Sequence, residues 1–375
     1  MATVNPASLV ATVTPIPALP PPRITTSKLR VGIVSSFLQA VPQICHDLRP
    51  ALTFRLSFAG TLVENPMGGC AMAQSSTRIE QMAPELERII STSEPIRELA
   101  DGFGGPQGPA EGPLWWRESG HLVFSDIHNN RRMKYEPGVG VSLLLEPTNR
   151  ANGLTRDLQG RLIACEHDSR RVTRQELDGS ITVVANSFQG RQLNRPNDVV
   201  VKSDGCIYFT DPWTSPNAPQ QWDLTFSGVY RVTPDLGTLT LLIDDFIVPN
   251  GLAFSPDESV LYINDSRRGH IRAFELSPNG TLAKHSDRVF VDLRGDEPGV
   301  PDGMKVDVEG NVYCGGSGGL WIMDPKGKKL GRVVHGAPAT TNLAFGGRPP
   351  PIWPLAARTG RPSTSPVETT LARST

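Results

Sequence analysis

An oxygen-bearing side chain opens each of six similar phrases in the middle of the sequence. The phrases include "EGPLWW", "NGLTRD", "NDVVVKSDG" and "DGMKVDVEG", and they begin at intervals of 40 to 53 residues. Four opening residues are asparagines and two are carboxylic acids, and a glycine follows in four of the six phrases. The opening residues are Glu111, Asn152, Asn197, Asn250, Asp302 and Asn342.

Side chains of this kind predict a cation site if the phrases are structural repeats, because equivalent positions of a closed repeat converge on one axis. Hard cations such as Ca²⁺ take about six to eight oxygen ligands, whereas zinc prefers Cys and His. Glu111 and Asp302 would supply two negative charges to balance one divalent cation. Ca²⁺ is the first choice, with Zn²⁺, Mn²⁺ and Mg²⁺ left open. The alternative is that Asn-Gly and Asp-Gly simply form turns between strands.

The elements that must position these residues are short strands. In the first five phrases a strand leads into an Asp, Glu or Gly turn and a second strand, and in most a third strand follows. Repeats of about 40 to 50 residues with this pattern are typical of the blades of a β-propeller. The sequence therefore predicts an all-β fold, a six-bladed β-propeller, in residues 76–347.

The two ends of the chain differ from the repeats. Residues 1–75 are rich in Pro, Ser, Thr and Ala and nearly lack acids, which predicts a low-complexity, disordered leader. An organelle transit peptide is an alternative, whereas a secretory signal is not indicated. Residues 348–375 contain three consecutive prolines, which cannot donate to a sheet ladder, so we expect a degenerate tail and an incomplete last blade. We expect "PIRELADGF" at 95–103 to pair into that blade.

Composition excludes several classes of partner. The 37 basic and 38 acidic residues give a net charge of −1, so nothing predicts binding to nucleic acid or to an anionic membrane. The sequence has no run of 18 apolar residues that would predict a membrane helix. Five scattered cysteines without a C-x-x-C pair favour a reducing compartment, and we expect a cytoplasmic protein.

Four phrases together resemble the SMP-30/gluconolactonase family of metal-dependent lactonases. They are "EGPLWW", "RPNDVVVKSDGCIYFTDP", "PNGLAFSPDE" and "VPDGMKVDVEGNVY", and the resemblance covers about residues 79–347. It implies a six-bladed propeller with one divalent metal, usually calcium, in the central channel. The metal residues implied by the resemblance are Glu111, Asn197, Asn250 and Asp302, and those expected to contact the substrate are Arg195, Asn197 and Asn152.

The activity implied by the resemblance is hydrolysis of a small-molecule sugar lactone to the aldonic acid, with Asp302 as general base or acid. Two alternatives remain open at this stage. One is a non-catalytic or inactive propeller whose channel ion only ties the blades together, and the other is a metal-dependent esterase with a different substrate. Substrate specificity would reside in loops such as residues 213–228.

A second pattern, "GGSGG" at 315–319, matches the G-x-S-x-G motif of serine hydrolases. That motif requires a strand, a sharp turn and a helix. Here strand-like residues both precede and follow the glycines, so we interpret the segment as a β-turn and not as a nucleophile at Ser317.

Overall fold

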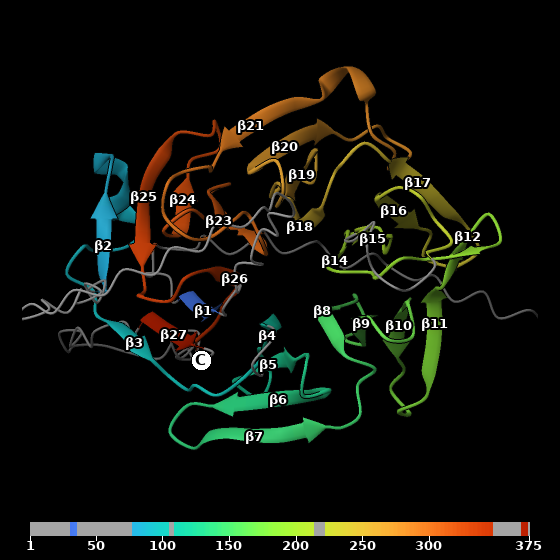
Figure 1. Cartoon of the computed structure of the whole chain (residues 1–375), viewed down its shortest axis with the longest axis horizontal. Coiled ribbons are helices and arrows are strands. Elements are labelled where there is room, and N and C mark those ends of the chain that lie inside the picture. The colour runs from blue at the N-terminus through green and yellow to red at the C-terminus, as the bar shows by residue number, and fades with distance from the viewer. Residues whose placement is uncertain (1–30, 36–76, 105–108, 214–221, 348–368, 374–375) are drawn as a thin grey trace, which may run out of the picture.

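Strands make up nearly all of the regular structure. The computed structural model describes residues 31–35, 77–104, 109–213, 222–347 and 369–373 (Figure 1). Within these ranges the only helices are two short 3₁₀ segments, η1 (Pro84–Arg88) and η2 (Lys284–Ser286). The all-β prediction is confirmed. No helix in the described ranges is long and apolar enough to cross a bilayer.

Five sheets, each built around four consecutive antiparallel strands, surround a common axis. Blade 1 contains β4 (Ala110–Trp116), β5 (His121–Asp126), β6 (Arg131–Glu136) and β7 (Gly140–Leu145). Blade 2 contains β8 (Ala151–Arg156), β9 (Leu162–Glu166), β10 (Arg171–Gln175) and β11 (Ile181–Ala185). A small hairpin of β12 (Ser187–Phe188) and β13 (Arg191–Gln192) follows blade 2.

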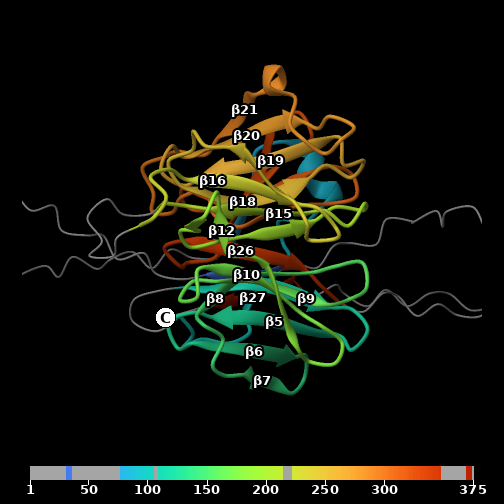
Figure 2. The ribbon, with the colours of Figure 1, turned by 90° about the vertical axis from the view of Figure 1, so that its right-hand side faces the viewer.

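The remaining blades repeat this order. Blade 3 contains β14 (Val199–Val201), β15 (Ile207–Asp211), β16 (Gly228–Val232) and β17 (Leu239–Ile243). Blade 4 contains β18 (Pro249–Phe254), β19 (Val260–Asp265), β20 (His270–Glu275) and β21 (Arg288–Asp292). Blade 5 contains β22 (Met304–Val306), β23 (Val312–Gly316), β24 (Gly319–Met323) and β25 (Lys329–Val334), with β2 (Arg78–Gln81) added at its edge. Blades 1 and 4 lie on opposite sides of the axis (Figure 2).

The prediction of six blades is wrong. The structure contains five blades, and a sheet of different construction occupies the sixth position. Here β26 (Thr340–Phe345) pairs with β1 (Val31–Ser35), which in turn pairs in parallel with β27 (Thr369–Arg373). β3 (Ile96–Glu98) completes the sheet through β27, as expected for 95–103. A reason for the difference lies in the sequence, because three prolines follow β26 and prolines cannot donate to a sheet ladder.

Strands from both ends of the chain therefore contribute to this sheet. β1 belongs to the predicted leader (1–75) and β27 to the predicted tail (348–375). The rest of both segments lies outside the described residues, so the disordered leader and the degenerate tail stay predictions.

The core lies between neighbouring blades. Tyr208 and Phe209 are adjacent in β15 and fully buried on opposite faces of the sheet, as a period of two residues requires. Phe209 packs with Ile163 and Val199 in the cluster between blades 2 and 3, whereas Tyr208 packs with Ile263 toward blade 4. Because each blade buries both faces in this way, the strand ends at the axis are left for polar residues.

Candidate active site

The opening residues are parts of strands or lie directly beside them, not turns. Glu111, Asn152 and Asn250 belong to β4, β8 and β18. In all three strands the pairing with the next strand is irregular at this point. Such bulges redirect a side chain relative to the sheet. The turn interpretation of Asn-Gly is therefore wrong for these copies.

The glycines that follow the opening residues let neighbouring blades approach closely. A Cβ atom on Gly112 would lie 2.3 Å from the carbonyl oxygen of Asn152. The equivalent distance is 2.5 Å between Gly153 and Asn197 and 2.4 Å between Gly251 and Asp302. No side chain fits at such distances. Each glycine thus places its own opening residue beside that of the next blade.

Hydrogen bonds and one further glycine connect the remaining pairs of neighbouring opening residues. The Thr210 hydroxyl donates to the Asn250 carbonyl oxygen at 2.8 Å, and the carbonyl of Thr210 accepts from the Asn197 N–H at 2.8 Å. A Cβ on Gly303 would lie 2.0 Å from the side chain of Asn342. The Asn342 amide donates to Glu111 Oε2 at 3.1 Å. All six openings are therefore consecutive neighbours around the axis.

Three buried carboxylates lie in this ring. The exposed fraction is 4% for Glu111, 8% for Asp302 and 3% for Asp198. Burial, followed by the charge of Asp198, raises the pKa of Glu111 to about 8. Burial and the charges of Glu111 and Asp198 raise the pKa of Asp302 well above its usual range. The three carboxyl groups thus lie close enough to disfavour one another's ionisation unless a cation is present.

Lys305 is the cation that opposes this charge. Its Nζ atom donates to Asn342 Oδ1 at 3.1 Å, and its positive charge lowers the pKa values of Glu111 and Asp198. Burial nevertheless dominates, since it raises the pKa of Asp198. One ammonium group cannot balance three ionised carboxylates, so ionisation of all three would require a further cation. We call Lys305, Asp198 and the six opening residues the axial cluster.

The axial cluster fits a hard divalent cation by its donor chemistry. Asp198 Oδ2 and Asn152 Oδ1 are buried and accept no hydrogen bond within the described residues. Elsewhere in proteins such oxygens are almost always satisfied. Across the described ranges, no three residues of the His, Cys, Asp and Glu types gather as a metal site. A cation here would therefore need amide oxygens, such as those of Asn197 and Asn250, besides the carboxylates.

The residues expected to contact a substrate lie on the blade 2 side of the ring. The Asn152 amide nitrogen is 3.3 Å from His167 Nε2. Burial and the positive charges of Arg195, His128 and Arg150 lower the pKa of His167 to about 3, so its imidazole is neutral. His167 can therefore accept from the Asn152 amide, which leaves the Asn152 oxygen free to accept from a ligand. Arg195 is half-buried, and burial lowers its pKa.

Asp198 was not among the expected site residues, although the sequence holds a signal for it. Asp198 follows Asn197 at the position where four other copies have glycine. A Cβ on Gly153 would lie 2.8 Å from Asp198 Oδ1, so this aspartate sits at the contact between blades 2 and 3. Lys305 and Asn342 join the site through contacts that the repeat alone does not indicate.

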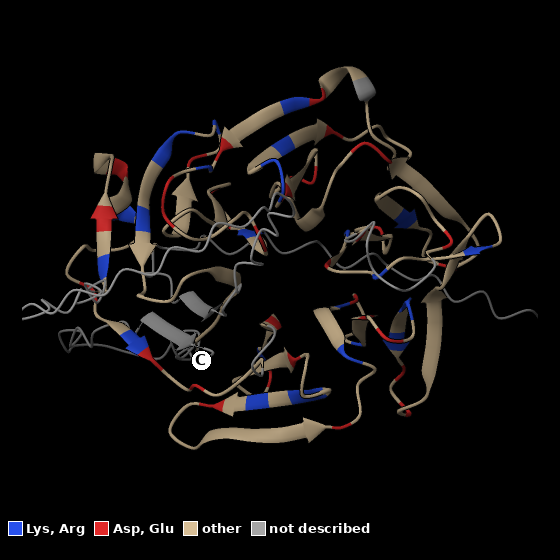
Figure 3. Cartoon of the chain, in the orientation of Figure 1, with Lys and Arg blue, Asp and Glu red and all other residues tan. Residues whose placement is uncertain are grey.

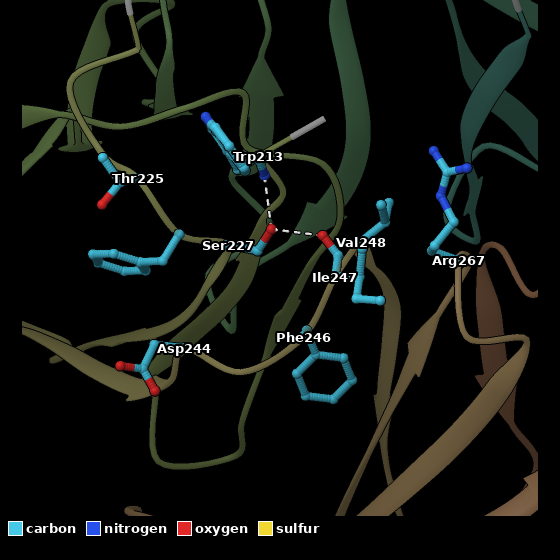
Figure 4. A pocket seen from close by; sticks show the side chains of 9 residues that line it. Trp213, Thr225, Ser227, Asp244, Phe246, Ile247, Val248 and Arg267 are labelled. Atoms are coloured by element: carbon cyan, nitrogen blue, oxygen red, sulfur yellow. Dashed lines mark hydrogen bonds between the residues drawn. The ribbon is translucent and has the colours of Figure 1, made fainter. Parts of the chain in front are cut away.

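A cavity of about 560 Å³ opens beside the ring, between blades 3 and 4 (Figure 4). The Ser227 hydroxyl connects its two sides, because it accepts from the Trp213 N–H and donates to the Ile247 carbonyl, both at 2.8 Å. Arg267 lines the cavity and directly follows Ser266, whose hydroxyl accepts from the Asn250 amide. The residues lining the cavity are Trp213, Thr225, Phe226, Ser227, Asp244, Phe246, Ile247, Val248 and Arg267.

Ser317 is not placed as a nucleophile. It lies in the turn between β23 and β24, which confirms the β-turn interpretation. Its hydroxyl donates to the Glu297 carbonyl oxygen at 2.7 Å, and its side chain is buried.

Fold and site together define a β-propeller with an oxygen-lined axial site that contains three carboxyl groups. The model of the SMP-30/gluconolactonase/LRE-like region matches residues 109–349, and the chain belongs to this family.

Curated relatives extend this result. A gluconolactonase of Zymomonas mobilis is 30% identical over 79% of this chain and 88% of its own length. A pentonolactonase of Haloferax volcanii is 28% identical over 63% of this chain and 77% of its own.

Solved structures agree in fold. A gluconolactonase of Xanthomonas campestris superposes with a TM-score of 0.61 at 32% identity, covering 71% of this chain and 87% of that chain. A calcium-binding regucalcin of Agrobacterium tumefaciens has a TM-score of 0.53 at 20% identity, over 66% of this chain and 82% of that chain, which supports the fold alone.

Proposed function

We propose that this protein is a metal-dependent lactone hydrolase that opens a sugar lactone to the aldonic acid. The observation that carries the proposal is the set of three buried carboxylates beside the Asn152 amide oxygen, which accepts no hydrogen bond within the described residues. Relatives named gluconolactonase and pentonolactonase support the lactone substrate. The relatives named regucalcin, one of which is described as calcium-binding, support a divalent cation, with Ca²⁺ as first choice.

Four residues would hold the cation: Glu111, Asn197, Asn250 and Asp302. They combine two charged and two neutral oxygen donors, so the pair of carboxylates would balance one divalent charge. When bound, the cation supplies a Lewis acid that polarises the lactone carbonyl and stabilises charge on its oxygen. Asp198 and Lys305 would adjust the charge of the ring without adding to this set of four.

Asp302 would act as the general base and then as the general acid. In that role its carboxylate takes a proton from the attacking water as the new C–O bond forms at the carbonyl carbon. The ester C–O bond then breaks, and the ring oxygen receives the proton and leaves as a hydroxyl group. The product is the open-chain hydroxy acid, and Asp302 returns to its starting state.

Substrate orientation would depend on Asn152, Asn197 and Arg195. The free Asn152 oxygen can accept from a sugar hydroxyl while His167 fixes the orientation of the amide. Arg195 can donate several hydrogen bonds to hydroxyl or carboxylate oxygens. The cavity beside Asn250 would accept the part of the substrate that projects from the lactone ring. Its lining includes residues from both ends of the 213–228 loop, where we expect specificity to reside.

The test is hydrolysis of glucono-δ-lactone by the full chain, followed in a pH-stat before and after metal removal. Ca²⁺, Zn²⁺ and Mn²⁺ are then added separately to the stripped protein. We expect turnover to vanish on stripping and to return with at least one ion. If the stripped protein is folded by circular dichroism and turnover is unchanged, the metal-dependent mechanism is wrong. If no ion gives turnover on this lactone, aryl esters and other lactones distinguish an esterase from a propeller with a purely structural ion.

A further inference from the structure

A second buried charge, outside the axial cluster, lies on the third strand of blade 1. Arg132 in β6 is only 6% exposed, and its Nε atom has no hydrogen-bond partner. Within the described residues its guanidinium forms neither an ion pair nor a hydrogen bond with a side chain. Burial lowers its pKa to about 10. Figure 3 shows the basic residues along β6.

Arg272 is a buried arginine at the equivalent strand of another blade, and it has carboxylate partners. It lies on the third strand of blade 4 and is 7% exposed. Its guanidinium donates to Asp245 at 2.7 Å and to Asp287 at 2.9 Å, and these two carboxylates raise its pKa. Leaving a buried charge without such partners is unfavourable. Arg132 therefore lacks the compensation that Arg272 has.

Within the described part of the chain, the carboxylate whose charge acts on Arg132 is already engaged by other donors. Glu166 of β9 is the anion whose charge acts on Arg132. It already accepts from Arg171 at 2.8 Å, Thr173 at 2.9 Å and Asn149 at 3.0 Å.

Two other ionisable groups near Arg132, Lys134 and His121, leave no unpaired charge. On β6 itself, Lys134 is paired with Glu136 at 2.6 Å. Burial and the Lys134 charge lower the pKa of His121, which is therefore neutral at pH 7. Of these groups, only Arg132 carries a charge without a partner of opposite sign.

Arg132 lines a cleft of about 340 Å³ between blades 1 and 2. This volume is at the small end of the range of about 300 to 1,000 Å³ that is typical of ligand sites. Apolar side chains form most of the wall, and Gln175 and His121 add neutral polar groups. The lining residues are Trp116, His121, Val123, Arg132, Leu144, Leu145, Leu162 and Gln175.

The cleft is separate from the axial cluster. Glu111 and Trp116 are five positions apart in β4, which corresponds to at most roughly 16 Å at about 3.3 Å per residue. The backbone of Arg132 is nearer, because Arg132 pairs with Ser125 and Ser125 pairs with Glu111, which corresponds to roughly 10 Å at about 4.8 Å per strand. The axial cluster and the cleft share no residue. A ligand in the cleft would therefore not compete directly with a substrate on the axis.

We propose that this cleft binds a small monocarboxylic acid with a compact apolar body, whose carboxylate pairs with Arg132. The guanidinium presents several N–H donors in a plane that suits the two oxygens of a carboxylate. The leucines and Trp116 would cover the apolar body, and Gln175 can donate to a carboxylate oxygen. The site would stabilise the folded chain whenever the acid is bound.

The test is isothermal titration calorimetry of the full-length chain with hexanoate, with hexan-1-ol as an uncharged probe of equal chain length. We expect hexanoate to bind at one site and at least about tenfold more tightly than hexan-1-ol. The Arg132→Met variant should lose at least about tenfold in hexanoate affinity. The matched control is Lys134→Gln, which removes a paired cation two residues along the same strand and should bind hexanoate like the parent.

Folding and function are checked separately from binding. Arg132→Met removes an unpaired charge from an apolar site, so we expect it to fold, and Arg132→Lys provides a second variant that keeps the charge but loses the planar fork. Both variants should keep the lactone hydrolysis of the parent. Absence of hexanoate binding would overturn the proposal, and so would equal affinity of Arg132→Met and the parent.

Discussion

The axial cluster and the cleft between blades 1 and 2 are two buried regions in which ionisable groups of opposite sign are left without enough partners. The axial cluster has three carboxylates around one ammonium group. Among the described residues that line it, the cleft has one guanidinium and no carboxylate. The axial cluster favours a bound cation and the cleft favours a bound anion, although both lie between neighbouring antiparallel blades. The difference indicates that the blades themselves favour neither charge, and that a few residues between them decide the charge of the ligand that is favoured.

The largest expected effect comes from Asp302→Asn. This variant keeps the shape of the side chain but removes the base and one ligand charge, so we expect lactone hydrolysis to fall by a factor of about 10³. Initial rates with glucono-δ-lactone measure this. Glu309→Gln, at an exposed position seven residues further on, is the matched control and should retain full activity. Normal activity of Asp302→Asn would remove the axial cluster from the mechanism.

Glu111→Gln should weaken cation binding more than it affects folding. The variant halves the negative charge of the proposed ligand pair, and we expect Ca²⁺ affinity to fall by about 10- to 100-fold. Calcium titration by calorimetry measures the change. At saturating Ca²⁺ part of the activity should return, because Asp302 is intact. An unchanged calcium affinity would show that Glu111 is not a ligand.

The pH dependence of stability should differ between metal-free and calcium-loaded protein. The pKa of Glu111 is raised from 4.5 to about 8, so the metal-free folded state binds more protons than the unfolded state between these values. Its stability should therefore fall as the pH rises from about 4.5 to about 8. Bound Ca²⁺ should reduce this loss because it replaces the protons. Thermal melts at several pH values, with EDTA and with Ca²⁺, would reveal parallel curves if the carboxylates do not share a cation site.

The smallest expected effect is a change in melting temperature, which compares the unpaired Arg132 at the cleft with the paired Arg272. Without a ligand, Arg132→Met should melt at the same temperature as the parent or about 2 °C higher, because it removes an unpaired buried charge. Arg272→Met should melt at a lower temperature, because it separates Arg272 from Asp245 and Asp287. Differential scanning calorimetry of both variants measures this. A larger loss for Arg132→Met than for Arg272→Met would contradict the assignment of Arg132 as uncompensated.

The repeat made much of the fold and of the axial cluster predictable. Equivalent positions in successive phrases predicted that the opening residues lie side by side, and the glycine contacts place Glu111 beside Asn152 and Asn250 beside Asp302. The number of blades was not predictable in the same way. The partners of β26 come from both ends of the chain, where no repeat indicates the pairing.

Charge compensation is the other property that sequence alone does not reveal. Asp198 could have been noticed, since it replaces a repeated glycine. Arg132 and Arg272 both lie in the third strand of a blade, and only the tertiary structure shows that Arg272 has carboxylate partners whereas Arg132 has none among the described residues. Ligand sites that arise from missing partners therefore require the folded structure.

The most direct test of the central claim is a calcium titration of one metal-free preparation, with bound Ca²⁺ and the initial rate of glucono-δ-lactone hydrolysis measured on the same samples. We predict one bound ion per chain and a rate that rises in parallel with occupancy, with both curves half-saturated at the same free Ca²⁺ concentration. Calcium binding without any change in rate, or full hydrolysis at zero occupancy, would contradict it.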